Sequence, residues 1–243
     1  AAGTLRLNYN GNLNFTFADL SDYNLMNSAE KLEFERLAGY YGDLDVNGEI
    51  VSEGYQQLYY QRLAEVKRGD DTYWMSEPLR FATSHSHNLF AEGGDDRMRY
   101  GIGFSYNKTQ GVMKGSDRDV LNGNVRLMYR YKTVAFTNYL NLDYTMSSRE
   151  NVSFSEFSRA NPYHRKLNEY GEPDQVMETY TDSDINSSSY LKTLNVYNPL
   201  YDMILNSSNE SRSFGFRNNF EIDWRVYDEL RVKGRFSISK SSA

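Results

Sequence analysis

Strict alternation of apolar and polar residues is the feature that most constrains how this chain can fold. The segment RMRYGIGFSY, residues 97–106, places Tyr100, Ile102 and Phe104 on one parity and Arg99, Gly101 and Gly103 on the other. A period of two puts the two sets on opposite faces of a β-strand. We therefore expect a strand here with one apolar face and one polar face.

The same alternation occurs in six further segments, which are residues 4–17, 85–94, 120–131, 134–147, 214–224 and 230–238. Aromatic residues make up 15% of the chain, a composition that suits amphipathic strands. The pattern predicts an all-β fold, an antiparallel up-and-down meander of about seven strands. One face should carry Leu121, Val125, Leu127, Phe136, Leu140 and Leu142, and the other Asn122, Arg126 and Asn141.

The connections between these segments alternate in length. Short ones lie at 94–96, 132–133 and 227–229, and longer ones at roughly 18–84, 107–119 and 148–213. An up-and-down meander with tight turns at one end and elaborated loops at the other has this order, which is typical of transmembrane barrels. We expect the tight turns to lie together at one end. The last long connection is rich in Ser, Asn, Tyr and Asp and is predicted to be irregular.

The polar face also favours a barrel. Arg and Asn at every second position would be costly inside a sandwich core, whereas a water-filled lumen accommodates them. The segments are longer than the five or six residues typical of soluble strands and match the 9–11 that a tilted membrane strand needs. No run of 18 apolar residues predicts a transmembrane helix. The alternative is a soluble sheet whose polar face meets bulk water.

The first long connection, 18–84, is predicted to contain two amphipathic helices. Residues 21–40 show helical spacing of apolar side chains after Ser21 or Asp22, either of which suits an N-cap. Residues 52–68 repeat the spacing and end before Gly69. We expect the two helices to pack as a hairpin above the barrel rim.

Charge and composition exclude several function classes. A formal net charge of −6 leaves no basic stripe for phosphates, so nucleic acid is not an expected partner. The absence of cysteine removes disulfides, thiolate metal sites and cysteine nucleophiles. The chain has no G-x-S-x-G motif and no other catalytic constellation, so we expect no catalytic residues and no enzyme activity.

One segment resembles a calcium loop, and it supplies the only cofactor candidate. Within GDLDVNGEIVSEG, residues 42–54, the carboxylates of Asp43 and Asp45 and the amide of Asn47 stand at ligand positions one, three and five of an EF-hand. Position twelve is Gly54, where a bidentate carboxylate belongs. The alternative is a polar turn at Asn47-Gly48 in a small hairpin.

Histidines and loop aromatics give weaker signals. His85 and His87 share a strand face but lack a third metal ligand at predictable spacing, so we interpret them as polar residues of the rim or lumen. His164 stands alone in a loop. Seven loop aromatics either stack on sugar rings or peptide groups or anchor the loops: Tyr40, Tyr41, Tyr73, Trp74, Tyr163, Tyr197 and Tyr201. No ligand-binding site is assigned from them.

Four longer phrases carry a family resemblance. They are DLSDYNLMNSAEKLEFE (19–35), YYQRLAEVKRGDDTYWMSEPLR (59–80), HNLFAEGGDDRMRYGIGFSYNKTQGVMKGSDRD (87–119) and YNPLYDMILNSSNESRSFGFRNNFEIDW (197–224). The chain resembles the first part of the barrel of SusC/RagA-type TonB-dependent outer-membrane transporters of Bacteroidetes. Its opening, AAGTLRLNYNG, resembles the point where the plug domain of that family gives way to the first strand. We expect residues 1–243 to be part of a larger protein.

The resemblance implies a transmembrane barrel of about 22 strands in the cell outer membrane. It implies import of oligosaccharides or peptides, with a SusD-type surface lipoprotein as partner, lipid around the barrel, and drive from the TonB–ExbB–ExbD system through a preceding N-terminal region. It places the insertion 18–84 and the loop 148–213 outside the cell. The competing hypothesis is a soluble or surface β-rich module for glycan binding or adhesion.

Overall fold

The computed structural model describes residues 4–183, 191–205 and 209–242. The chain divides into two compact units. The sheet unit comprises Ala1–Phe17, Phe81–Arg149 and Ser208–Ala243, and the insertion unit comprises Ala18–Arg80 and Glu150–Ser207. The two predicted long connections, 18–84 and 148–213, therefore supply one unit together.

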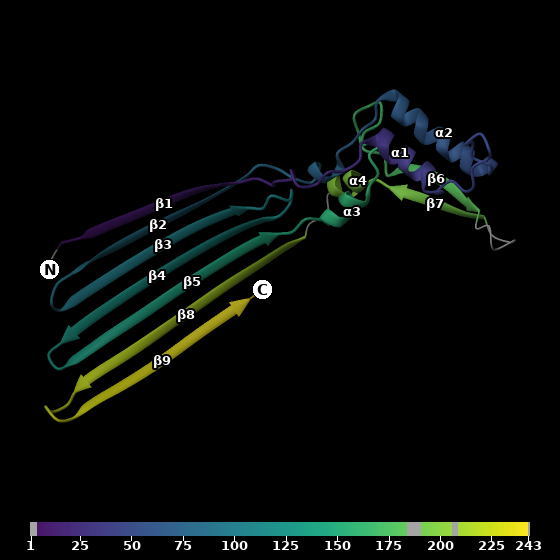
Figure 1. The fold of residues 1–243 in the computed structure, drawn as a ribbon. Helices are drawn as coiled ribbons and strands as arrows, with labels where there is room; N and C mark the ends of the chain where they lie inside the picture. Colours follow the sequence, from purple (N-terminus) through teal and green to yellow (C-terminus); the bar gives the residue numbers. More distant parts are fainter. Residues whose placement is uncertain (1–3, 184–190, 206–208, 243) are drawn as a thin grey trace. The chain divides into compact units, whose positions relative to one another are not determined.

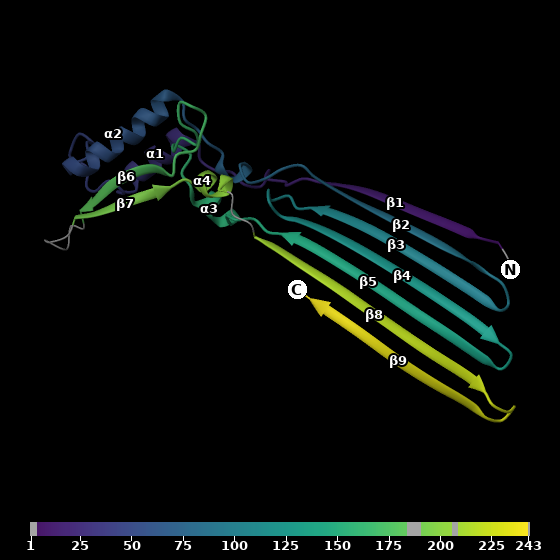
Figure 2. The ribbon, with the colours of Figure 1, turned by 180° about the vertical axis from the view of Figure 1, so that it is seen from behind.

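The sheet unit is a single antiparallel sheet of seven strands in the order β1-β2-β3-β4-β5-β8-β9 (Figures 1 and 2). Each strand pairs with the strand before it in this order. The strands are β1 (Arg6–Thr16), β2 (Ala82–Gly94), β3 (Met98–Gln110), β4 (Asp117–Tyr131), β5 (Val134–Ser148), β8 (Glu210–Arg225) and β9 (Arg231–Ser242). The predicted seven-strand meander is confirmed.

The register confirms the two faces of the sheet. Val125 lies opposite Leu140, and one residue away Asn124 lies opposite Asn141. Because successive side chains point to opposite faces, the apolar and polar sets predicted for β4 and β5 separate cleanly. The sheet unit leaves its apolar face open, and Leu7 at one edge strand is 67% exposed while Phe236 at the other is 66% exposed.

The ends of the sheet differ as predicted. The short turns 95–97, 132–133 and 226–230 lie at one end, which we call the turn end. At the opposite end Thr16 faces Ala82 and Ser148 faces Glu210, where the chain leaves for the insertion unit. The connection expected at 107–119 is shorter than predicted, because β3 and β4 extend further and pair from Gln110 with Asp117.

The insertion unit contains the two expected helices, α1 (Ser28–Leu37) and α2 (Glu53–Arg68), which pack together. The start predicted at Ser21 or Asp22 is wrong: the N-cap is Asn27, whose side chain accepts a hydrogen bond from the amide of Glu30. Helix α2 ends at Gly69 in the left-handed conformation, as predicted. No helix within the described residues has the length and apolar character required to span a membrane.

The segment predicted to be irregular has regular structure. It forms α3 (Phe154–Arg159), the antiparallel pair β6 (Val176–Ser183) and β7 (Leu191–Tyr197), and α4 (Pro199–Ile204). Residues 184–190 and 206–208 of this segment lie outside the described residues. A short 3₁₀ helix, η1 (Trp74–Ser76), precedes β2.

Two apolar clusters form the core of the insertion unit. Each combines side chains from the first and the second inserted segment. One joins Leu32, Tyr41, Ile50 and Leu58 to Tyr163, and the other joins Trp74 to Val152, Phe157 and Leu200. Neither segment alone supplies either cluster, which explains why the two fold as one unit.

Candidate functional site

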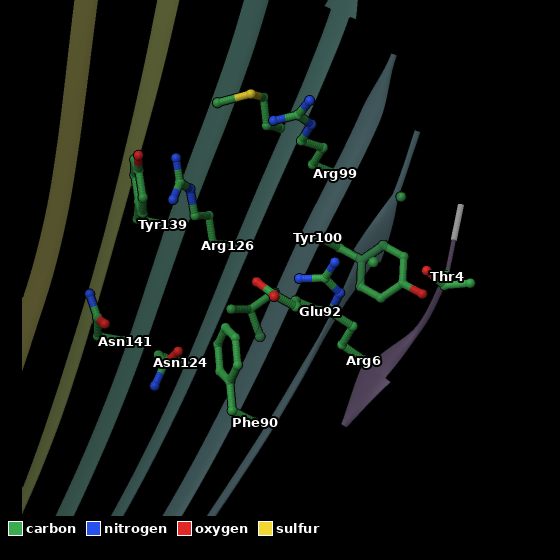
Figure 3. A pocket seen from close by; sticks show the side chains of 15 residues that line it. Thr4, Arg6, Phe90, Glu92, Arg99, Tyr100, Asn124, Arg126, Tyr139 and Asn141 are labelled. Atoms are coloured by element: carbon green, nitrogen blue, oxygen red, sulfur yellow. The ribbon is translucent and has the colours of Figure 1, made fainter. Parts of the chain in front are cut away.

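The polar face of the sheet contains a hollow of about 590 Å³ near the turn end (Figure 3). Its floor is β3, where Gly101 and Gly103 present no side chain to this face. A Cβ atom on Gly103 would stand 2.5 Å from Nδ2 of Asn124, and one on Gly101 would stand 3.2 Å from the ring of Phe90. The two glycines therefore leave space for the side chains of their neighbours, and Gly101, Phe90 and Asn124 line the hollow.

Three arginines surround this hollow, one each from β1, β3 and β4. Arg6 and Arg126 lie in one cross-strand row that runs Arg6, Glu92, Gly101, Arg126. Arg99 lies one row closer to the turns. The guanidinium carbon of Arg126 lies 5.3 Å from the ring centre of Tyr139, a cation–π distance. Among the described residues, no carboxylate forms an ion pair with any of the three arginines.

A second hollow of about 580 Å³ lies beside the first, over β4, β5, β8 and β9. Its basic side chains are partly neutralised, because Asp223 pairs with Arg231 and the neighbouring Glu221 pairs with Arg235. We call the basic side chains of both hollows the basic patch. They are Arg6, Arg99, Arg126, Arg130, Lys132, Arg225, Arg231 and Lys233.

His85 and His87 lie on the apolar face. Of the two positions expected for them, the lumen is therefore wrong, and the rim stays a prediction. His87 shares its parity with Leu89, whereas Ser86 belongs to the polar face. The hydroxyl of Tyr9 lies 2.7 Å from Nδ1 of His87, and the ring of His85 lies 5.6 Å from that of Tyr106. The Tyr9–His87 contact lies near the middle of the apolar face, and the His85–Tyr106 contact lies closer to the end farthest from the turns. Among the described residues, no group of three or more His, Cys, Asp or Glu is arranged to hold a metal ion.

The predicted calcium segment forms a small hairpin, with Leu44 bridged to Ile50. The carboxylate of Asp45 accepts hydrogen bonds from the amides of Asn47 and Glu49, both at 2.8 Å. These bonds lower the pKa of Asp45. The polar turn expected as the alternative is thus present, and calcium binding by Asp43, Asp45 and Asn47 stays a prediction.

The loop aromatics divide into two groups. Tyr41 and Tyr163 are fully buried and Trp74 nearly so, which means that they anchor the insertion unit and offer no surface for a ligand to stack on. Tyr40, Tyr73 and Tyr197 are exposed, and Tyr201 is half-buried. Stacking on sugars or peptides therefore remains an interpretation for the exposed members only.

Sequence reasoning missed a buried charge cluster in the insertion unit. Arg62 of α2 is 2% exposed and donates two hydrogen bonds to the carboxylate of Glu178 on β6, at 2.9 and 2.7 Å. It also donates to the hydroxyl of Tyr41 at 2.9 Å, and that hydroxyl donates to Glu35. His164, which appeared isolated in the sequence, lies 3.4 Å from Glu178.

The cluster shifts two acid–base equilibria. Burial alone raises the pKa of the Glu178 carboxyl, but hydrogen bonds from His164 and Arg62 outweigh it and lower the pKa to about 2. Burial raises the pKa of the Tyr41 hydroxyl well above its usual value. No local sequence pattern indicates this cluster, because its partners are far apart in the chain. Arg62 and Glu178 are separated by 116 positions.

Comparison with known proteins gives a fold but no family. No family model matches the chain, and no curated protein matches it. The solved structures that match it include three that cover almost all of this chain. The RagAB peptide importer in its closed-closed state gives a TM-score of 0.70 at 13% identity, over 99% of this chain and 28% of that one.

The other two structures agree. The RagAB peptide transporter gives a TM-score of 0.69 at 12% identity over 98% of this chain. The RagAB peptide importer in its open-open state gives a TM-score of 0.68 at 13% identity over 99% of this chain. In each case the chain spans 28% of the matched chain. At this identity the likeness establishes the fold alone, and the seven-strand antiparallel meander agrees with the SusC/RagA resemblance.

Proposed function

We propose that this chain is a segment of an outer-membrane transporter of the SusC/RagA kind, and that its sheet is part of a transmembrane barrel. The observation that carries the proposal is a seven-strand meander whose whole apolar face is open, opposite a face rich in Arg and Asn. In a barrel the apolar face meets lipid and the polar face lines the lumen. Neither face then bears an unmet desolvation cost.

The contact between His85 and Tyr106, toward the end of the apolar face farthest from the turns, supports this placement. Both side chains combine an apolar ring with polar atoms, the side-chain type that is enriched where hydrocarbon gives way to headgroups. Asn138 and Asn218 also lie on the apolar face, and the amide of Asn138 donates to Asn218 at 2.6 Å. Mutual hydrogen bonding lowers the cost of placing these two amides against lipid.

The cargo and partners follow as parts of the same proposal. The matched structures are peptide importers, so a peptide is the first cargo to test and an oligosaccharide the second. A SusD-type lipoprotein would cover the insertion unit on the cell surface, and the TonB–ExbB–ExbD system would act through a region outside these residues. The protein binds and moves its cargo, and no enzymatic step is proposed.

Lipid exposure is the direct test. Because the chain has no cysteine, single cysteines at Leu127 and Leu142 can carry an environment-sensitive fluorophore, with Asn124 and Asn141 as matched controls on the opposite face of the same strands. In native membranes of the producing cells, we expect lipid-attached quenchers to act on the first pair and a water-soluble quencher to act on the second.

Cell fractionation separates this proposal from a soluble glycan-binding or adhesion module. The protein should sediment with outer membranes. Recovery from the medium, together with quenching of Leu127 labels by the water-soluble reagent alone, would reject the transporter.

A further inference from the structure

The turn end of the polar face carries an excess of positive charge, although the chain has a formal net charge of −6. Eight basic side chains line the two hollows, against the three acidic ones Glu92, Glu221 and Asp223. Glu221 and Asp223 already pair with Arg235 and Arg231. A concentrated positive potential on an acidic chain indicates a negatively charged ligand.

The group best suited to this surface is a carboxylate. Arg6, Arg99 and Arg126 are exposed, and no described residue forms an ion pair with them. A guanidinium presents planar paired donors that match the two oxygens of a carboxylate. Three such donors around one hollow can hold more than one carboxylate.

The spacing of the arginines indicates an extended chain. Arg6 and Arg126 are three strands apart in one cross-strand row, which is about 14 Å at roughly 4.8 Å per step. In an extended polypeptide, side chains on one side repeat about every 6.8 Å, so residues i and i+4 span about 14 Å. A single small anion reaches only one of the two arginines.

Neutral groups around the hollow also suit a polypeptide. Asn124 and Asn141 face each other across β4 and β5 in the next row, and both line the hollow (Figure 3). Each amide side chain offers a donor and an acceptor, the pair that a peptide backbone requires. At Gly101 and Gly103 the side chains of Phe90 and Asn124 lie over the backbone of β3, which places the Asn124 amide at the floor of the hollow.

We propose that the basic patch binds an acidic polypeptide segment in extended conformation, lying across the strands with the Asp or Glu side chains of residues i and i+4 toward Arg6 and Arg126. The segment is separate from residues 1–243. The proposal concerns the polar face alone and does not depend on whether the apolar face meets lipid.

Peptide binding to the full 243-residue chain in detergent micelles provides the test. The probe is a fluorescein-labelled decapeptide of alternating Glu and Ser, with alternating Gln and Ser as its uncharged match, followed by fluorescence anisotropy. The Glu peptide should bind and the Gln peptide should not, and added salt should weaken binding. In the double variant Arg6→Gln/Arg126→Gln, affinity should fall about tenfold or more, because two charge-assisted contacts are lost.

The matched control is Arg118→Gln/Arg149→Gln, which removes the same charge at the opposite end of the sheet, where both arginines line a separate hollow. Its affinity should stay within about twofold of that of the unaltered chain. Arg118 lies eight residues from Arg126 along β4, roughly 27 Å at about 3.4 Å per residue, which is several times the Debye length of about 8 Å. The charge-retaining variant Arg6→Lys/Arg126→Lys should bind with intermediate affinity, since ammonium groups lack the paired donors. Circular dichroism establishes that each variant keeps its sheet.

Three results would overturn the proposal. Equal losses in the two Gln variants would mean that only net charge matters. Equal binding of the Glu and Gln peptides would remove the role of the carboxylates. Tighter binding of oligogalacturonate or of inorganic phosphate than of the Glu peptide would assign the patch to a different occupant. None of these results bears on the lipid exposure of Leu127, so the two proposals fail separately.

Discussion

At the scale of single residues, Asp45 decides how the hairpin at 42–54 is held. Its carboxylate accepts from two backbone amides of the turn, whereas no side-chain hydrogen bond of Asp43 is present in the described structure. Side chains of this type stabilise turns by replacing missing backbone partners. The two acids that a calcium loop would use together therefore have separate roles here.

We predict that Asp45→Ala opens the hairpin and that Asp43→Ala does not. Hydrogen exchange of the Asn47 and Glu49 amides should quicken several-fold in the first variant only, because both amides lose their acceptor. Calcium titration of the unaltered chain is the companion measurement. A calcium-dependent slowing of exchange that both substitutions abolish would establish the calcium loop instead.

Arg62 is the second residue whose substitution should change a measurable property, the stability of the insertion unit. It is enclosed by four aromatic rings and two carboxylates, so removing its charge leaves Glu178 buried without its arginine and Glu35 paired with Lys31 alone. We predict that Arg62→Met lowers the unfolding free energy of the insertion unit by about 3–5 kcal/mol. Denaturant titration followed by Trp74 fluorescence, with Trp224→Phe as background, measures it.

The matched control lies on the same helix. Arg68 pairs with Glu65 at 2.8 Å but is 50% exposed, and exposed pairs contribute only about 0.2–1 kcal/mol. Arg68→Met should therefore cost little. If both variants lost a similar amount of unfolding free energy, the Arg62 cluster would contribute no more stability than an exposed ion pair does.

At the scale of elements, helix α1 begins later than its sequence pattern indicates. Ser21 and Asp22 fit an N-cap in composition, but Asn27 and Glu30 form the reciprocal capping box in which each side chain bonds to the backbone of the other. We predict that Asn27→Ala lowers the unfolding free energy by about 1 kcal/mol and that Ser21→Ala leaves it unchanged. Thermal denaturation by circular dichroism compares the two, and an effect of Ser21→Ala as large as that of Asn27→Ala would contradict this helix start.

The stability contributed by the Arg62–Glu178 ion pair between α2 and β6 should depend on pH. The pKa of Glu178 is lowered to about 2 in the folded chain from an ordinary value of 4.5. A lowered carboxyl pKa stabilises the fold above its unfolded value and loses that contribution as pH falls toward the folded value. We predict that the insertion unit loses stability between pH 4.5 and about 2, where Arg62 and His164 face a carboxyl that becomes protonated.

The control for this window is Glu178→Gln. It should be less stable than the unaltered chain at pH 7, because Arg62 loses its bidentate partner, and it should show a shallower decline below pH 4.5. An identical decline in both proteins would assign the acid sensitivity to other carboxylates.

The strands and the helices α1 and α2 were predictable from the sequence, whereas the packing of the two inserted segments into one unit was not, for a physical reason. Alternation such as Val125 against Asn124 is local and repeats with every residue pair, so it identifies both faces and the number of strands. It does not fix where a strand ends, and β3 and β4 run on because polar residues such as Lys108 and Asp119 still pair. The cores around Tyr41 and Trp74 draw on segments far apart in sequence, which no local pattern reveals.

The hollow on the polar face shows the same limit. The glycines at 101 and 103 were visible as members of the polar parity. That they form the floor of a site bordered by Arg6 and Arg126 depends on the cross-strand row, which the register alone defines. The alternation of residue types identifies the polar face, and only the pairing of strands β1 to β4 brings the residues of the hollow together.

At the scale of the whole molecule, the sheet unit has two unpaired edges and an open apolar face. Strands β1 and β9 end the strand order, so each presents backbone N–H and C=O groups without partners in this sheet. Exposed apolar patches on soluble monomers seldom exceed about a few hundred Å². The apolar face here extends across all seven strands, from Leu7 on β1 to Phe236 on β9.

We therefore predict that the 243-residue chain self-associates in water and becomes monodisperse in detergent. Detergent replaces lipid on the apolar face, whereas in water that face and the edges of β1 and β9 are covered only by other copies. Light scattering with and without detergent measures the difference, and Leu7→Ser/Phe236→Ser should reduce association more than Asn8→Ser/Ser237→Ala on the opposite face. A stable monomer in detergent-free buffer would mean that the apolar face is buried internally, and it would favour the soluble glycan-binding module over the transporter.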